Sequence, residues 1–285
     1  MTQYSSLASV RATRARLDEL GLSTKKRLGQ HFLVDDGVVG KIVRLASLVP
    51  ESSVLEIGPG IGTLTEALLA SKISLTAVEV DKALLSGLTA AFPHLSLIGG
   101  DALAPETIAL VQKTAPIALV ANLPYAVAAT VVLEYFQMLP SLASATVMVQ
   151  KEVAERIAAK PGTKEYGAYT IKLQLLAGVS GQFGVSPQSF YPPPRVNSTV
   201  IRLERLKQCG PEELLPAANM LADAAFFQRR KTIRNSMQAY FAVHSPESAP
   251  VDELLSAADI DPKTRGETLS AEAFVVMAQA QLLTR

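Results

Sequence analysis

The chain has 285 residues, of which 48% are hydrophobic and 19% are charged. This length and composition suit one large α/β domain with a smaller unit beside it. The 27 Lys and Arg residues nearly balance the 26 Asp and Glu residues, which excludes a generally basic nucleic-acid binder, so any nucleic-acid-binding face must be local. No apolar run approaches the ~18 residues that a membrane helix needs.

Cysteine and histidine usage narrows the class of protein further. The single cysteine, Cys209, excludes an internal disulfide framework and indicates a reducing compartment. We therefore expect a cytoplasmic protein, with an organellar form left open. The histidines His31, His94 and His244 are scattered without companion ligands, so no metal site is expected. The first residues lack the apolar core of a secretory signal.

The N-terminal half alternates between helical and strand patterns, which predicts a parallel α/β sheet. An amphipathic helix over 7–20, ended by Gly21, is followed by a loop over 25–33. Strands are expected at 54–57, 75–80, 95–98, 117–121 and 145–149. Helices are expected from an Asp35 or Asp36 cap to 48, from 63 onward, over 82–91 behind an Asp81 cap, and over about 126–138.

Three glycines at alternate positions, Gly58, Gly60 and Gly62, join the first predicted strand to its helix. Glycine lets the backbone turn sharply and approach a ligand without interference from a Cβ atom. The dinucleotide-binding fingerprint Gly-x-Gly-x-x-Gly does not fit, because Thr63 stands where its third glycine belongs. Taken alone, the loop leaves a ligand site and a structural turn both open.

Polar residues stand at the ends of four successive predicted strands. Glu56 precedes the glycine loop, Glu79 closes the second strand, Asp101 follows the third and Asn122 ends the fourth. Glu79 can hold two ribose hydroxyls, and Asp101 can accept from an adenine amino group. Each acid alone is equally explained as a surface residue, but the ordered set predicts a cofactor site at the carboxyl edge of the sheet.

The tetrapeptide Asn122, Leu123, Pro124 and Tyr125 follows the fourth strand in a tight proline turn. Asn122 and a backbone carbonyl near Pro124 can accept hydrogen bonds from an exocyclic amino group, while Tyr125 can stack on its ring. An Asn-capped turn with a core tyrosine is the alternative that the tetrapeptide alone leaves open.

The second half of the chain begins with a predicted helix from 150, a polar loop over 161–167 and a helical pattern over 169–177. An antiparallel pair of strands is expected at 179–185 and 198–206, and the pattern is helical from 210 onward. Between the two strands, the prolines Pro192–Pro194 stiffen the backbone and present Phe190 on a fixed loop.

Two clusters of basic residues could form the local RNA face. They comprise Lys25, Lys26 and Arg27, and then Arg229, Arg230, Lys231 and Arg234. The second cluster contains no acid, which suits contact with phosphates. In a helix, Phe226, Phe227 and Arg230 would share one side, whereas Arg229 would face elsewhere. A solvated basic helix face is the alternative.

Together these motifs resemble the KsgA/RsmA family of small-subunit ribosomal RNA adenine dimethyltransferases. The glycine loop is similar to the S-adenosylmethionine loop of Rossmann-like methyltransferases, and the tetrapeptide is similar to the Asn-Leu-Pro-Tyr signature of ribosomal RNA adenine dimethyltransferases. The matching segments are 29–33, 56–62, 122–125, 150–156, 190–196 and 229–235. The family often has Asn where this chain has His31.

The resemblance implies a Rossmann-like methyltransferase domain with a seven-stranded, mostly parallel sheet over 25–207. A helical extension over 1–24 precedes it, and a small all-helical RNA- and ribosome-contacting domain over 208–285 follows. It also implies transfer of methyl groups from S-adenosylmethionine to the N6 amino groups of two adjacent adenosines in the 3′-terminal hairpin of small-subunit rRNA. The enzyme is expected to act as a monomer on a pre-assembled small-subunit particle during ribosome biogenesis.

On this resemblance the expected site residues fall into three groups. The catalytic residues are Asn122, Leu123, Pro124, Tyr125 and Phe190. The cofactor-binding residues are His31, Leu33, Gly58, Glu79, Asp101 and Asn122. The RNA-binding residues are the seven basic residues of the two clusters.

Two alternatives stay open. An Erm-type large-subunit rRNA adenine methylase shares the fold and motifs, although the basic segment 229–235 and the long helical tail favour the small-subunit enzyme. A ribosome-assembly or transcription factor could keep the fold and the RNA surface without turnover. The intact tetrapeptide and glycine loop argue against that loss of activity.

Overall fold

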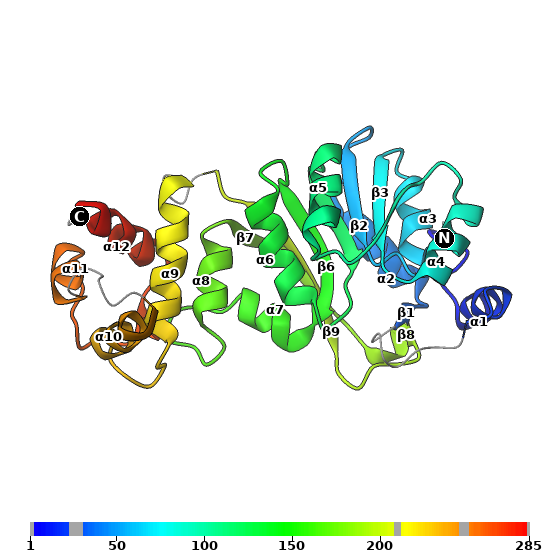
Figure 1. Cartoon of the computed structure of the whole chain (residues 1–285). Coiled ribbons are helices and arrows are strands. Elements are labelled where there is room, and N and C mark those ends of the chain that lie inside the picture. Colours follow the sequence, from blue (N-terminus) through cyan, green and yellow to red (C-terminus); the bar gives the residue numbers. More distant parts are fainter. Residues whose placement is uncertain (1–2, 23–30, 208–211, 245–250, 284–285) are drawn as a thin grey trace. The chain divides into compact units, whose positions relative to one another are not determined.

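The computed structural model describes residues 3–22, 31–207, 212–244 and 251–283 (Figure 1). It divides into two compact units, of which unit 1 comprises Met1–Ala154 and Val179–Arg205. Unit 2 comprises Glu155–Gly178 and Leu206–Arg285. This division differs from the expected boundary after residue 207, because the contacts of Glu155–Gly178 group them with the C-terminal helices.

Unit 1 is built on a seven-stranded sheet with the strand order β4-β3-β2-β5-β6-β9-β7. The strands are β2 (Ser53–Ile57), β3 (Ser74–Glu79), β4 (Ser96–Gly99), β5 (Ala118–Asn122), β6 (Ser144–Gln150), β7 (Ala177–Val185) and β9 (Ser198–Arg205). The pairs from β4 to β6 are parallel, and β9 runs antiparallel to β6. The predicted seven-stranded, mostly parallel sheet is confirmed.

The helices of unit 1 are α1 (Val10–Glu19), α2 (Asp36–Ala46), α3 (Thr63–Leu69), α4 (Lys82–Ala91), α5 (Pro105–Thr114) and α6 (Ala128–Met138). Helix α7 (Lys151–Ile157) begins in unit 1 and ends in unit 2. Asp35 accepts from Val38 N at the start of α2, and Asp81 accepts from the first turn of α4. Both predicted caps are therefore confirmed. The sequence pattern did not predict α5, where Pro105 occupies the first turn.

The central strands are buried over almost their whole length. Leu55 of β2, Leu119 of β5 and Val147 of β6 have no measurable exposure. A parallel sheet whose two faces are covered needs such continuous apolar strands. Because these strands run in one direction, their carboxyl ends come together at a single edge of the sheet, where the predicted polar residues stand.

A separate two-stranded sheet lies in unit 1. Its strands are β1 (Phe32–Leu33) and β8 (Phe190–Tyr191), which pair antiparallel with Phe32 opposite Tyr191 and Leu33 opposite Phe190. The sequence predicted a loop up to residue 33, so the end of that prediction is wrong. Pairing across some 160 residues leaves no local signal in either short segment.

Unit 2 is helical, as predicted for the C-terminal region. Its α-helices include α8 (Ala168–Gln174), α9 (Leu215–Phe226), α10 (Ile233–His244), α11 (Val251–Ala257) and α12 (Ala271–Leu283). They enclose their own core, with Tyr166, Leu221, Met237 and Phe274 all fully buried. No helix in the described part of the chain is long and apolar enough to cross a membrane.

Candidate active site

A cavity of about 390 Å³ opens at the carboxyl edge of the sheet in unit 1. Its volume falls in the range of small-molecule sites, about 300–1,000 Å³. Nine of the ten predicted catalytic and cofactor residues line it, and these are His31, Leu33, Gly58, Glu79, Asp101, Asn122, Leu123, Pro124 and Tyr125. The sheet therefore brings together residues that lie far apart in the sequence. Among the described residues, no cluster of three or more His, Cys, Asp or Glu could hold a metal ion.

The glycine loop forms one wall of the cavity. Gly58, Gly60 and Gly62 all have positive φ angles, of 68°, 61° and 94°. A Cβ atom on Gly62 would lie 2.5 Å from the Phe92 ring, and one on Gly60 would lie 3.3 Å from the Phe32 ring. Glycine is therefore required at these positions by both backbone conformation and close packing.

Glu79 lies beside this loop and supports it. Its carboxylate accepts hydrogen bonds from Gly60 N at 3.2 Å and from Asp81 N at 2.9 Å. The side chain is only 6% exposed, and burial raises its pKa above the ordinary value, although the backbone hydrogen bonds counteract part of that rise. Glu79 thus connects the end of β3 to the glycine loop.

Glu56 is a second buried carboxyl group on the same wall. It is 1% exposed and accepts a hydrogen bond from Thr65 Oγ1 at 2.7 Å. Burial raises the pKa of Glu56 to about 8; the Thr65 hydrogen bond lowers it and the nearby Glu79 charge raises it, both to a smaller extent. Glu56 is therefore mostly protonated at neutral pH, which its position in the motif did not indicate.

Asp101 also lines the cavity, directly after β4. It is exposed, and its Oδ1 accepts from Leu103 N at 2.9 Å. The apolar part of the lining includes the buried side chains of Leu33 and Leu84. An exposed acid beside apolar surface can accept a hydrogen bond from a planar ring lying over that surface.

The Asn122 side chain is oriented by a hydrogen bond across the cavity. Its Nδ2 donates to the backbone oxygen of His31 at 3.2 Å. Since a carbonyl oxygen only accepts, the amide nitrogen must face it, and Asn122 Oδ1 is left as an acceptor. Next in the chain, the Pro124 carbonyl accepts from Val127 N at 3.1 Å within the turn. Leu123 O is therefore the better candidate for a second acceptor.

Tyr125 is held by two long-range contacts. Its hydroxyl lies 2.6 Å from Ser198 Oγ on β9, and its ring stacks on His31 with the centroids 5.7 Å apart. His31 Nδ1 in turn lies 2.7 Å from Pro192 O. Because that carbonyl must accept, Nδ1 carries a proton in this arrangement. Sequence reasoning missed Ser198 and the role of Pro192, since neither lies near Tyr125 in the chain.

Phe190 does not line the cavity, so its expected place among the catalytic residues is wrong. Its side chain is 3% exposed and belongs to a buried cluster with Leu33, Val38 and Ile42. β8 pairs with β1, and Phe190 lies in the core of unit 1. The residue was misassigned because the pairing of β8 cannot be predicted from local sequence.

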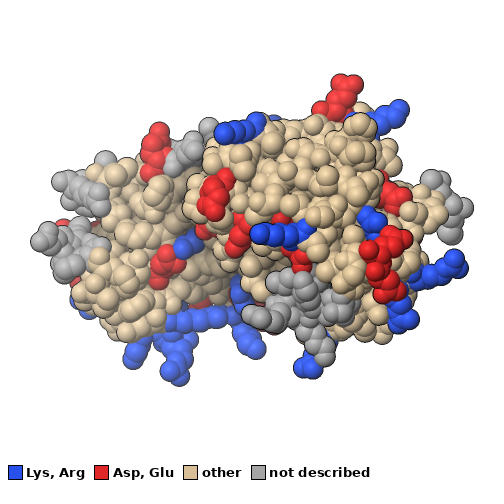
Figure 2. All heavy atoms as spheres, turned by 45° about the vertical axis from the view of Figure 1, so that its right-hand side comes forward, with Lys and Arg blue, Asp and Glu red and all other residues tan. Residues whose placement is uncertain are grey.

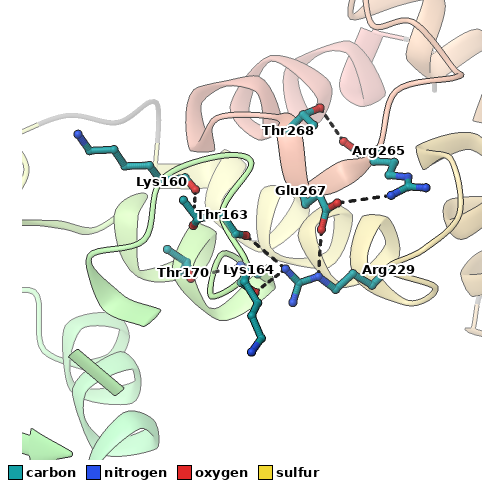
Figure 3. Close-up of polar contacts among 9 residues, drawn as sticks. Lys160, Thr163, Lys164, Thr170, Arg229, Arg265, Glu267 and Thr268 are labelled. Atoms are coloured by element: carbon teal, nitrogen blue, oxygen red, sulfur yellow. Dashed lines mark hydrogen bonds and ion pairs between the residues drawn. The ribbon is translucent and has the colours of Figure 1, made fainter. Parts of the chain in front are cut away.

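The predicted basic segment in unit 2 lies mostly between two helices. α9 ends at Phe226 and α10 begins at Ile233, so the continuous helix considered for this segment is absent. Arg229 binds within unit 2, with its Nε 3.1 Å from Glu267 Oε2 and its Nη2 hydrogen-bonded to the carbonyls of Thr163 and Lys164 (Figure 3). Arg234 forms a bidentate ion pair with Asp252 at 2.6 and 2.8 Å.

Arg230 and Lys231 are both exposed. Figure 2 shows Lys and Arg side chains projecting from the lower left edge of the molecule, with few acidic side chains between them. The first predicted basic cluster, Lys25, Lys26 and Arg27, lies outside the described residues. The free part of the second predicted basic cluster is therefore smaller than the sequence indicated, because two of its four side chains, Arg229 and Arg234, already bind protein groups.

Comparisons with known proteins place this chain in a family. The sequence matches the profile of the ribosomal RNA adenine dimethylase family over residues 21–276. Proteins named Ribosomal RNA small subunit methyltransferase A are similar over nearly their full length. The protein from Kineococcus radiotolerans is 40% identical, covering 96% of this chain and 91% of its own. The protein from Corynebacterium efficiens is 38% identical, covering 93% of each chain.

Solved structures show the same fold. A dimethyladenosine transferase from Plasmodium falciparum has a TM-score of 0.68 at 24% identity and covers 87% of this chain and 96% of its own. The 23S rRNA methyltransferase ErmE has a TM-score of 0.62 at 22% identity and covers 87% and 98%. Given the match over most of its length and relatives 38% and 40% identical, the chain belongs to the ribosomal RNA adenine dimethylase family.

Proposed function

We propose that the protein transfers methyl groups from S-adenosylmethionine to the N6 amino groups of two adjacent adenosines in the 3′-terminal hairpin of small-subunit rRNA. It acts as a cytoplasmic monomer on a pre-assembled small-subunit particle, during ribosome biogenesis. The observation that carries the proposal is the gathering of the Asn122–Tyr125 turn and the four strand-end polar residues on one cavity. The names of the relatives support the choice of small-subunit rRNA.

The cavity fits S-adenosylmethionine on two grounds. Its wall holds the buried carboxylate of Glu79, and this suits a ligand with positive charge better than one with phosphates. Its glycine loop lets the ligand approach the backbone closely. S-adenosylmethionine supplies, when bound, a methyl group on a sulfonium sulfur that is open to attack by a nucleophile.

Each of the expected cofactor-binding residues then has a defined part in holding the cofactor. Glu79 accepts hydrogen bonds from the ribose hydroxyls, and Asp101 accepts from the adenine amino group. Gly58 gives the ligand access to the loop backbone, while the buried side chain of Leu33 covers the ligand with apolar surface. His31 closes this side of the cavity through the hydrogen bond from Asn122 to its backbone oxygen.

The target adenine is held by its amino group. Asn122 Oδ1 and Leu123 O accept one hydrogen bond each from the two hydrogens of this amino group. These two bonds favour a pyramidal nitrogen and fix the direction in which its lone pair points. The nitrogen of adenine is a poor nucleophile because its lone pair is delocalised into the ring, so this orientation supplies most of the acceleration. No strong general base is needed, since a methylated ammonium group loses its proton readily.

Tyr125 holds the ring of a base that has swung out of its helix. The His31 ring already covers one face of Tyr125. The adenine therefore stacks on the other face. The hydrogen bond between Tyr125 and Ser198 fixes the plane of the tyrosine ring before the base arrives.

The test is mass spectrometry of small-subunit precursor particles after incubation with isotopically labelled S-adenosylmethionine. We expect labelled dimethyladenosine at two adjacent positions of the 3′-terminal hairpin, and none with Asn122→Ala. Large-subunit rRNA serves as the competing substrate. Label in that RNA alone would indicate an Erm-type enzyme, and label in neither RNA would indicate an assembly factor without turnover.

A further inference from the structure

The segment Gln3–Leu20, here called the N-terminal strap, precedes the part of the chain that matches the family profile, residues 21–276. It nevertheless belongs to unit 1 and contacts several elements that carry the cavity (Figure 1). Its contacts are polar at the N-terminal end, and along α1 they are both apolar and polar.

The polar end of the strap is bound by two carboxylates. Asp36 of α2 accepts from Tyr4 N at 3.0 Å and from Ser5 N at 2.7 Å. Glu66 of α3 accepts from Ser5 Oγ at 2.8 Å and from Ser6 N at 2.8 Å. Ser5 is 1% exposed, so its own bonds to the two carboxylates are shielded from water, whereas Ser6 is exposed. The strap thereby joins α2 to α3, the helix that follows the glycine loop.

The Tyr4 ring occupies a space that only a glycine leaves open. A Cβ atom on Gly40 of α2 would lie 2.4 Å from this ring. The Tyr4 hydroxyl accepts from Arg44 Nη1 at 2.7 Å. The docking of the strap on α2 is therefore specific in shape as well as in hydrogen bonding.

The apolar side of α1 packs behind the cavity wall. Leu17 is 4% exposed and belongs to one buried cluster with Phe32, Ile61 and Leu84. All three of these partners line the cavity. Phe32 also lies against the glycine loop, as its distance from a Cβ on Gly60 shows. Phe32 thus lies in the same buried cluster as Leu17 of α1 and also packs against the glycine loop, whose backbone is expected to contact the cofactor.

α1 is also seated on α4. Leu20 packs against Gly87, where a Cβ atom would lie 2.7 Å from the leucine side chain. Arg16 Nη2 donates to the Gly87 carbonyl at 2.7 Å. Arg14 lies over the Tyr191 ring, 4.9 Å from its centroid, and Tyr191 pairs with Phe32. The strap therefore contacts α2, α3, α4 and the two-stranded sheet.

We infer that the strap is a positioning element for the methyl-donor pocket, which it holds in its binding shape from the outside. This inference rests on the proposed function, because it concerns the affinity for S-adenosylmethionine. Its physical basis is close packing: a void behind Phe32 and Ile61 lets these side chains move away from the ligand. Leu17 and Leu20 act through the wall and touch no reacting atom.

The experiment uses three variants of the full chain. Leu17→Ala removes the packing of α1 against the cavity wall. Gly87→Ala displaces Leu20 of the strap by a change in α4, and alanine is a better helix former than glycine. Leu142→Ala is the matched control, because Leu142 is equally buried in unit 1 but precedes the amino end of β6, away from the cavity. Leu17→Met tests rescue by a side chain of similar volume.

Two quantities are measured on folded protein. Calorimetry should show that Leu17→Ala and Gly87→Ala raise the Kd for S-adenosylmethionine about tenfold. Leu142→Ala and Leu17→Met should stay within about twofold of the unchanged chain. Hydrogen exchange of the ligand-free protein should be faster at residues 57–64 in the two strap variants than in the control.

The two readouts separate the inference from the proposed function. Failure of the unchanged chain to bind S-adenosylmethionine would count against the proposed function, while the exchange rates at 57–64 would still test the strap. Unchanged exchange and unchanged affinity in Gly87→Ala would overturn the inference. Equal effects of Leu142→Ala would also overturn it, because they would reflect general destabilisation.

Discussion

Glu56→Gln should remove a large pH dependence of the stability of unit 1. Burial raises the pKa of Glu56 to about 8 from its ordinary value of 4.5. A difference of about 3.5 pKa units corresponds to about 5 kcal/mol, at about 1.4 kcal/mol per unit. Glu56 is almost fully buried, so solvent screening does not reduce this figure much.

The sign of the effect follows from proton binding in the two states. Below pH 4.5 both states hold the proton, and the contribution of Glu56 to stability is fully present. Between pH 4.5 and about 8 the unfolded state releases its proton while the folded state keeps it, so the free energy of unfolding falls as pH rises. Above about 8 the contribution is lost.

Urea unfolding of the unchanged chain and of Glu56→Gln, followed by circular dichroism between pH 5 and 8, measures the effect. The free energy of the unchanged chain should fall relative to the variant by several kcal/mol, of order 1.4 kcal/mol per pH unit. Glu106→Gln, which removes an exposed carboxylate, is the control and should show no such trend. A difference between unchanged chain and Glu56→Gln that does not vary with pH would refute the assigned pKa.

Four further predictions follow from the site. Asn122→Ala should abolish methyl transfer in single-turnover assays with little change in RNA binding, and a near-normal rate would remove Asn122 from the mechanism. Glu79→Ala should weaken S-adenosylmethionine binding by about 1.5–3 kcal/mol in calorimetry, the range for hydrogen bonds to a charged group, and unchanged affinity would reject it as a ribose ligand. Phe190→Ala should cost about 3–5 kcal/mol of stability in a melting experiment, while the folded fraction methylates at a near-normal rate; a slow rate without lower stability would restore its expected catalytic role. Arg230→Gln should reduce the slope of log K for particle binding against log salt concentration by about 0.7–0.9. Arg229→Gln should leave that slope unchanged and make hydrogen exchange faster over residues 161–166.

The carboxyl-edge residues could be predicted because each has a local signal. Glu79 and Asn122 end strands whose apolar runs are evident in the sequence, and parallel strands must present their carboxyl ends together. The glycine loop has its own signal in the spacing of its glycines. In the structure, the order of the strands brings all of these residues to one cavity.

The residues that were misassigned depend on pairing between distant segments. Phe190 is in the core because β8 pairs with β1, and two-residue strands have no periodicity to detect. Arg229 is engaged by the carbonyls of Thr163 and Lys164, which lie about 65 residues earlier in the chain. Charge and spacing alone cannot distinguish an arginine that binds backbone carbonyls from one that is free to bind phosphate.

The structure also gives a physical reason why this glycine loop suits a cation rather than a dinucleotide. A pyrophosphate is bound by backbone N–H groups at the start of a helix. Here Gly60 N already donates to the Glu79 carboxylate, so a donor that a phosphate would need is occupied. The same carboxylate would repel the phosphate charge, whereas a sulfonium or ammonium group would be attracted. The spacing of the glycines and the hydrogen bond of Glu79 therefore argue independently for the same class of ligand.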